Sequence, residues 1–389
     1  MNESKMKLTT TLAVMAVFSI TMCLGAITPA IAILMQVYSD VPPATITFVS
    51  TLPSLLGIPA SIIVGMLVGK KIGIKKMAII LILLFIVTGC APTFINGFPL
   101  LLVSRALFGL AIGGLSVLGN PLVTSLYVED KRANILGIGT FIAFGGAMVM
   151  QFVGGFLADL QWNYVFLTHA LAIIPLVLIL FFLPEQPLQA DEQTQKTKKH
   201  IPAKAWAVSL LFAVMGILIM PLLLNSSVIS ATMSDKATIA ATVAVVYSIG
   251  CMLGGIAFGP VYKIFKRYCM TFSLIVTAIG MVGVFFSPNI TILCVSMFIA
   301  GIGYCSAMPA AMMAIGMVTP PESVAFATAI MMALMNVGSF LSTAWLLVIG
   351  NITGDAVYSP IMIGAIVYGV IGVLIIFFNP FPKQSNEVV

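Results

Sequence analysis

The feature that most limits the fold of this chain is a series of long apolar runs along its 389 residues. A helix needs about 20 apolar residues to cross the roughly 30 Å hydrocarbon core of a membrane. Charged pairs, prolines and glycines separate the runs. They predict twelve membrane-spanning helices, at 8–36, 45–69, 77–95, 98–126, 134–158, 163–183, 205–230, 238–261, 269–287, 290–317, 324–349 and 357–379.

The charge content supports this interpretation. Only 8% of the residues are charged and 60% are hydrophobic, whereas a soluble domain carries about 25% charged residues. A cytosolic enzyme, a nucleic-acid-binding protein and a secreted disulfide-rich domain are therefore excluded. The six cysteines are scattered without a CxxC pair, so we expect free buried thiols, no metal site and no cofactor.

Only one separator is long, and it runs from Pro184 to Lys204 with Gln, Glu, Asp and Lys throughout. Such a composition is typical of a solvated linker. It divides the chain into an N-terminal six-helix bundle at 1–183, a cytoplasmic linker at 184–204 and a C-terminal six-helix bundle at 205–389. The expected class is an all-α integral membrane protein of twelve transmembrane helices.

The basic residues predict the orientation, because Lys and Arg gather in cytoplasmic loops. With the N-terminus inside, Lys236 is the only basic residue in an outer loop. Both termini are therefore expected in the cytoplasm, and the composition suits a bacterial plasma membrane. A cleaved signal peptide is the alternative for the first run, but that run continues past Pro29 to Gln36 and is long enough to span. The cytoplasmic basic residues are Lys5, Lys7, Lys70, Lys71, Lys75, Lys76, Lys131, Arg132, Lys196, Lys198, Lys199, Lys204, Lys263, Lys266, Arg267 and Lys383.

One basic residue, Arg105, lies inside a predicted span, about eight residues into the fourth run. An arginine at a helix centre costs about 2.5–3.5 kcal/mol on insertion scales and usually marks a pathway or a site. It could bind a ligand, or it could be a structural residue bonded to carbonyls or polar groups of neighbouring helices. His169 in the sixth run is either a proton carrier or a packing residue.

Two further elements are candidates for contact with a ligand. Asn225 lies near the outer end of the seventh run, followed by two serines; hydrogen bonding across helices is the alternative role. In the tenth run one helix face carries a stripe of adaptable side chains, which indicates either core packing or a cavity for an amphipathic or aromatic ligand. The stripe consists of Met297, Tyr304, Met308 and Met312.

Glycines recur in three elements. The loop after the second run contains Gly65, Gly69 and Gly73 with four lysines, and a similar glycine-plus-basic hairpin begins at Gly259 after the eighth run. The repeat indicates two pseudo-symmetric halves, which are the signature of a secondary transporter. The fourth run has Arg105 followed by Gly109, and the fifth run has Gly137, Gly146, Gly154 and Gly155.

On these motifs the chain resembles the major facilitator superfamily over essentially its whole length. The first loop is similar to the family's GxLaDrxGrr signature without its Asp. The Arg105–Gly109 segment is similar to the RxxqG element, with Phe108 in place of Gln. The fifth run is similar to the antiporter motif, with Met150 and Gln151 in place of Gly-Pro.

The resemblance implies a monomeric carrier in which two bundles tilt around a central cavity lined by spans 1, 4, 7 and 10. Its substrate-binding residues would be Arg105, Asn225, Tyr304 and Met308. Protons would be carried by His169, by an interfacial acid such as Asp40 or Asp159, or by the substrate itself. The conformational motif residues would be Gly65, Gly73, Gly109, Gly146, Gln151, Gly154 and Gly155.

Two functions stay open at this point. The first is a proton-linked exporter of small amphipathic compounds, such as drugs or metabolites. The second is an organic-anion uptake or exchange carrier in which Arg105 binds a carboxylate through both of its terminal nitrogens. An embedded enzyme would need a nucleophile–base pair or a metal cluster within the spans, and the sequence offers neither.

Overall fold

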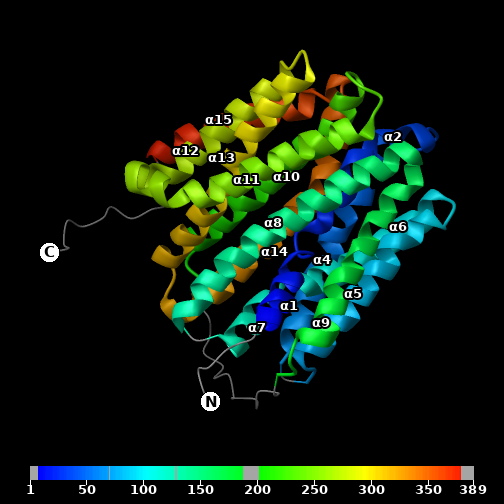
Figure 1. Cartoon of the computed structure of the whole chain (residues 1–389). Coiled ribbons are helices and arrows are strands. Elements are labelled where there is room, and N and C mark those ends of the chain that lie inside the picture. Colours follow the sequence, from blue (N-terminus) through cyan, green and yellow to red (C-terminus); the bar gives the residue numbers. More distant parts are fainter. Residues whose placement is uncertain (1–7, 70, 128, 187–200, 378–389) are drawn as a thin grey trace. The chain divides into compact units, whose positions relative to one another are not determined.

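The computed structural model describes residues 8–69, 71–127, 129–186 and 201–377 (Figure 1). Within these ranges ten helical stretches are long and apolar enough to cross a membrane. One stretch, from Ala237 to Phe285, contains two helices joined by a turn, and the pair Leu8–Phe18 and Cys23–Val37 forms one further span that is bent by 50°. Counted in this way, the described residues contain the twelve predicted spans, and the predicted all-α membrane fold is confirmed.

The chain divides into two compact units, and the first comprises residues 1–195 and 236–241. Its elements are α1 (Leu8–Phe18), η1 (Cys23–Ala30), α2 (Ile31–Val37), α3 (Pro43–Ile46), α4 (Phe48–Leu67), α5 (Ile74–Cys90), η2 (Ala91–Thr93), α6 (Phe98–Ser116), α7 (Gly119–Leu126), α8 (Glu129–Leu160), η3 (Trp162–Ala172) and α9 (Ile173–Phe182).

The second unit comprises residues 196–235 and 242–389. Its elements are α10 (Ala203–Ala231), α11 (Ala237–Phe265), η4 (Lys266–Tyr268), α12 (Cys269–Phe285), α13 (Ile290–Val318), α14 (Pro321–Thr353) and α15 (Ser359–Phe377). The boundary between the units falls inside the predicted linker, of which residues 187–200 lie outside the described part. The first turn of α11 belongs to unit 1, and the rest of this helix belongs to unit 2.

The two units repeat the same internal pairings. In unit 1, α4 and α5 both pack against α6, and in unit 2, α11 and α12 both pack against α13. The first span of unit 1 packs against α8, and α10, the first span of unit 2, packs against α14. These corresponding pairs give the internal repeat a structural basis that the loop sequences only suggested.

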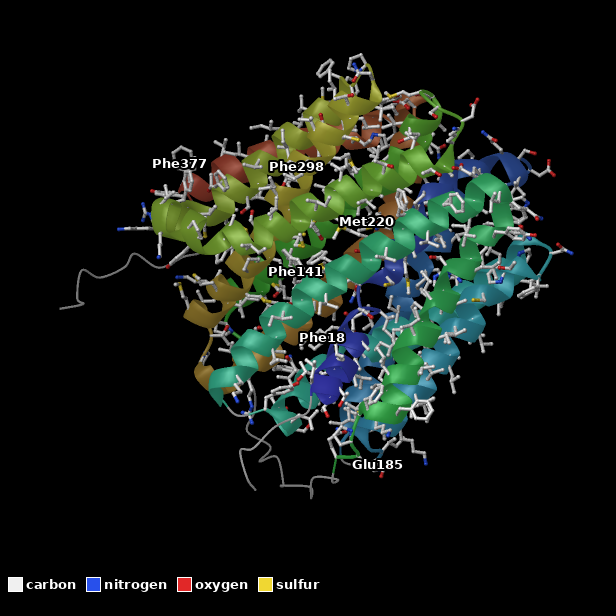
Figure 2. The ribbon with its side chains drawn as sticks, viewed as in Figure 1. Phe18, Phe141, Glu185, Met220, Phe298 and Phe377 are labelled. Carbon is white, nitrogen blue, oxygen red and sulfur yellow. The ribbon has the colours of Figure 1, made fainter. Side chains whose placement is uncertain are left out.

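Each unit has a tightly packed interior and an apolar surface. In unit 1 the core includes Phe85, Phe108 and Leu115, which are completely buried. In contrast, Phe141 (labelled in Figure 2) and Phe152, both on α8, are about half exposed. Large apolar side chains on the outside of a helix that is itself apolar are what a lipid environment requires.

The two basic loops each make a tight turn through one left-handed residue. In the first loop Gly69 has a φ of 77°, and its N–H donates to the carbonyl of Ile72 at 2.8 Å. In the second loop Lys266 has a φ of 47°, a backbone conformation that residues other than glycine seldom adopt. The predicted Lys70 lies outside the described residues. Gly69 in the first loop and Lys266 in the second therefore have the same type of backbone conformation.

Candidate functional site

Arg105 lies in the second turn of α6 and caps the end of another helix. Its Nη2 donates to the carbonyl oxygens of Thr88 at 3.2 Å and Gly89 at 3.1 Å. Both carbonyls belong to the last turn of α5, where four carbonyl groups have no intrahelical partner and the helix dipole is negative. The guanidinium therefore supplies hydrogen bonds and positive charge where α5 needs them. Ser104 adds a weaker bond to Thr88, at 3.3 Å.

Aromatic rings enclose the rest of this guanidinium. Its Cζ lies 4.5 Å from the centroid of Phe108 and 5.2 Å from that of Phe166, so it interacts with both π systems. Arg105 is 1% exposed, and its Nε–H has no hydrogen-bond partner. This geometry corresponds to the structural role, in which Arg105 bonds to carbonyls of a neighbouring helix. Its Nε–H is the donor that stays unbonded.

His169 belongs to the same aromatic cluster. Its Nδ1 lies 2.8 Å from the carbonyl oxygen of Phe166. Because a carbonyl can only accept, Nδ1 carries the proton and Nε2 presents a lone pair, which has no partner. The ring packs against Phe85 and Phe108, with centroids 5.3 and 4.8 Å apart. A proton on Nε2 would add a second cation to the cluster that already holds Arg105.

The structure thus joins two residues that the sequence had assigned to separate roles. Phe85, Phe108 and Phe166 complete the cluster. Sequence reasoning had named Phe108 only as a replacement in the family element and had not singled out the other two. One signal for Phe108 was available, because it occupies the position where the family element has a polar Gln. An aromatic ring at this position fits a cation that is held by carbonyls and π systems.

Helices α4 and α6 pack against each other, and two glycines of the fourth span allow their backbones to touch. A Cβ at Gly109 would lie 2.5 Å from the carbonyl oxygen of Pro53, and one at Gly113 would lie 2.3 Å from the Cα of Gly57. Small residues at these positions let the two helices approach closely. Gly65 and Gly73 differ, because a Cβ on either would meet nothing within 4 Å.

The interrupted first span packs against the glycines of α8. This span leaves the α-helical conformation after Phe18 and continues as the 3₁₀ helix η1, which contains Pro29. A Cβ at Gly146 would lie 1.8 Å from the carbonyl oxygen of Ser19, and one at Gly154 would lie 2.9 Å from that of Ala26. The backbone of α8 therefore approaches the span on both sides of the break.

Other residues of this motif contact neighbouring segments. The amide nitrogen of Gln151 lies 3.4 Å from the Cβ position of Gly25, beside the same break. A Cβ at Gly155 would lie 2.4 Å from the Cβ of Ala241, in the first turns of α11. One turn further along α8, the carboxylate of Asp159 accepts hydrogen bonds from the N–H groups of Ala237 and Thr238 and from the Thr238 hydroxyl. Asp159 thus caps the start of α11.

Asn225 in unit 2 holds the loop between α14 and α15. Its Nδ2 donates to the carbonyl oxygens of Ala356 at 2.9 Å and Val357 at 2.8 Å. In the same loop the Asp355 carboxylate accepts bonds from the N–H groups of Val357, Tyr358 and Ser359. Partial burial raises the pKa of Asp355, whereas the hydrogen bonds lower it. The hydrogen bonds together have the larger effect, so the pKa of Asp355 lies below its ordinary value.

The predicted stripe on α13 divides into a core residue and a half-buried face. Met297 is completely buried, whereas Tyr304, Met308 and Met312 are each half-buried. The Tyr304 hydroxyl lies 3.8 Å from the sulfur of Met335 on α14. Tyr247 on α11 is near Tyr304, and its buried hydroxyl interacts with the thiol of Cys251 one turn away. Tyr247 is a polar group of this region that sequence reasoning missed, because it lies on a different span.

These features define a polytopic α-helical membrane protein whose two six-span units share one packing scheme. A family model matches the chain over residues 13–235 and again over 205–388, and its description is Major Facilitator Superfamily. The chain belongs to this superfamily of membrane transporters.

Solved transporters share the fold at low sequence identity. A bacterial homologue of the human lysosomal transporter Spinster, inward-facing and occupied, is 18% identical, with a TM-score of 0.73 over 95% of both chains. The nucleoside transporter NupG is 13% identical, with a TM-score of 0.77 over 95% of this chain and 98% of that one. The xylose transporter XylE from E. coli is 13% identical, with a TM-score of 0.74 over 97% of both chains.

A curated human relative matches a smaller part. Solute carrier family 22 member 14 of Homo sapiens is 25% identical over 133 residues, which are 34% of this chain and 22% of the relative. The match therefore spans less than a quarter of that protein's length.

Proposed function

We propose that this transporter is a proton-linked exporter of small amphipathic molecules, such as drugs or metabolites, and that it works by alternating access. The observation that carries the proposal is the packing of the antiporter-like glycines of α8 on the break in the first span. Gly146 and Gly154 leave room for the backbone of this span at Ser19 and Ala26. A span that is already interrupted can change its angle there with little loss of helical hydrogen bonding.

The half-buried face of α13 supports an amphipathic or aromatic substrate. Tyr304 offers a ring and a hydroxyl, and the flexible, polarisable side chain of Met308 adapts to ligands of different shape. Tyr247 adds a second hydroxyl near Tyr304. Asn225 acts by positioning the loop before α15, because its two Nδ2 hydrogens are bonded to that loop.

Asp159 is a better candidate for proton coupling than His169. The carboxylate of Asp159 caps the first turn of α11, and this interaction weakens when the acid is protonated, because the negative charge at the helix N-terminus is lost. His169, by contrast, would gain its proton beside a buried guanidinium. A proton on Asp159 therefore has a structural consequence that suits a coupled carrier.

An organic-anion carrier is the second candidate. The observation that favours it is the buried Nε–H of Arg105, which has no protein partner and could donate to a carboxylate. In this case Arg105→Lys would abolish transport even where the variant is as stable as wild type, because lysine lacks the guanidinium fork. Normal transport of anions by Arg105→Gln would exclude this alternative.

We place the protein in the bacterial plasma membrane as a monomer, with both termini in the cytoplasm and no nucleic-acid partner. The strong bias of Lys and Arg towards one side of the predicted spans supports this orientation. A reporter fused after Val389 that is active only in the cytoplasm tests it, and an inactive fusion of normal abundance would reverse the topology.

Export is tested by comparing the small-molecule pools inside and outside cells that express the chain. Wild type and Gly145→Ala are compared with Gly146→Leu, which carries a side chain where the Cβ alone would overlap the Ser19 carbonyl. Compounds depleted inside and enriched outside, with wild type and Gly145→Ala only, support export. An uncoupler should abolish that difference. Enrichment inside, or a difference that no uncoupler affects, contradicts the proposal.

Once a substrate is found, coupling is tested in liposomes with Asp159→Asn and His169→Gln. Counterflow, in which labelled substrate exchanges with unlabelled substrate, needs no proton movement. Asp159→Asn should keep counterflow but lose accumulation driven by a pH gradient, whereas His169→Gln should keep both. The opposite assignment follows if only His169→Gln loses accumulation.

A further inference from the structure

Two helices of unit 2, α11 and α13, touch through their backbones over about two turns. A Cβ at Gly301 would lie 2.4 Å from the carbonyl oxygen of Tyr247 and 3.0 Å from the backbone nitrogen of Cys251. On the other side of the contact, a Cβ at Gly254 would lie 2.4 Å from the carbonyl oxygen of Ile302. Neither position has room for a side chain, and glycine at both lets the two backbones approach closely.

This contact carries one cysteine on each helix. Cys251 lies one turn after Tyr247, and Cys305 lies one turn after Gly301. The Cα–Cβ bonds of a helix tilt towards its N-terminus, so the side chain of Cys305 leans back towards the turn of Gly301, beside which Cys251 lies. The two thiols are close enough to interact with each other. Both cysteines are free, and Cys251 is 3% exposed while Cys305 is half-buried.

We propose that Cys251 and Cys305 are an oxidisable dithiol, which a hydroperoxide converts to a disulfide between α11 and α13. A small neutral peroxide can enter an apolar bundle. The half-buried Cys305 reacts first: its sulfur breaks the O–O bond and forms a sulfenic acid, and the peroxide leaves as an alcohol or water. Cys251 then attacks the sulfenic sulfur, the S–S bond forms and one water is released. The two thiols lose two electrons, and the peroxide gains them.

The remaining cysteines offer no comparable pair in the described residues. Cys294 lies eleven residues before Cys305 on the same helix, which places it about 16 Å along the axis. Cys23 lies in unit 1, where its thiol donates to the carbonyl of Ser19. Cys90 and Cys269 show no interaction with another thiol in the described residues, so we expect the disulfide between Cys251 and Cys305.

The test counts free thiols in the purified full-length protein. Samples with and without hydrogen peroxide are quenched, denatured in detergent and labelled with a maleimide of high mass, so that each free thiol adds one step on a gel. Reduced wild type should show six labels, and peroxide-treated wild type should show four. Dithiothreitol should restore six labels, which distinguishes a disulfide from irreversible oxidation.

Variants identify the pair. Cys251→Ser and Cys305→Ser should each show five labels before peroxide and should not lose two labels after it. Cys294→Ser is the matched control on α13, and it should fall from five labels to three. Six labels on treated wild type, or the loss of two labels in either Cys251→Ser or Cys305→Ser, would overturn the assignment.

Discussion

A methyl group at Gly146 should destabilise the protein, whereas the same group at the preceding residue should not. A Cβ at Gly145 meets nothing within 4 Å, but one at Gly146 would lie 1.8 Å from the carbonyl oxygen of Ser19. Ordinary van der Waals contact begins near 3.4 Å. The two backbones would therefore have to separate by about 1.6 Å at this point.

The expected magnitudes follow from helix propensity and overpacking. Alanine is favoured over glycine inside a helix by roughly 0.5–1 kcal/mol, and Gly145→Ala should show that gain or no change. Gly146→Ala makes the same gain but must displace backbone atoms. Overpacking in a tight interior typically costs about 1–3 kcal/mol, and a backbone contact that cannot rotate away belongs at or above the upper end.

The assay heats each variant in detergent and measures the fraction that still elutes as a monodisperse peak. Gly146→Ala should have a clearly lower apparent melting temperature than wild type, and Gly145→Ala should match wild type or exceed it. Both variants insert the same residue into adjacent positions of α8, so a difference between them reports the local contact. Equal melting temperatures would refute the close approach of α8 and the first span.

Three further outcomes follow from the described geometry, each read as an apparent melting temperature. Arg105→Met should destabilise the protein by about 1–3 kcal/mol, because the Gly89 carbonyl loses its donor while Ser104 still donates to the Thr88 carbonyl. An unchanged melting temperature would contradict the capping role. Lys266→Val should melt below Lys266→Gly by the equivalent of roughly 1–2 kcal/mol, since the left-handed φ of 47° disfavours a side chain; the reverse order would refute this backbone conformation. Asp355→Asn should melt below wild type at pH 7. The folded-state pKa of Asp355 lies below its ordinary value of 3.8, so its contribution to stability is present above pH 3.8 and is lost as the pH falls through the folded-state pKa. The difference in melting temperature between wild type and Asp355→Asn should therefore close on acidification. A difference that widens would contradict the assignment.

The spans could be predicted because their signal is local. A run of about 20 apolar residues without charges is a helix in a membrane whatever it packs against. The helix ends were less predictable. The fifth predicted span was 134–158, whereas α8 extends over Glu129–Leu160, because backbone hydrogen bonding continues beyond the apolar run. The break in the first span also escaped prediction, since Pro29 indicates a distortion but not its extent.

The candidate site was only partly predictable. The position of Arg105 inside an apolar run marked it as unusual, and the sequence left two roles open for it. The choice between them depends on the carbonyls of Thr88 and Gly89 and on the ring of Phe166, which come from other spans. Asn225 is a similar case, because its partners lie in a loop more than a hundred residues away.

The sequence by itself determined which segments are apolar and long enough to span a membrane and where nearly all of the charges lie, because both follow from the cost of placing polar groups in hydrocarbon. Only the tertiary structure decided which side chains face one another. It brought His169 to the cluster of Arg105, set Gly146 against the carbonyl of Ser19 and placed Cys305 beside Cys251. The physical reason is that an apolar helix has no polar face to mark its inner side, so close contact between particular small and polar residues sets its rotation and its partners.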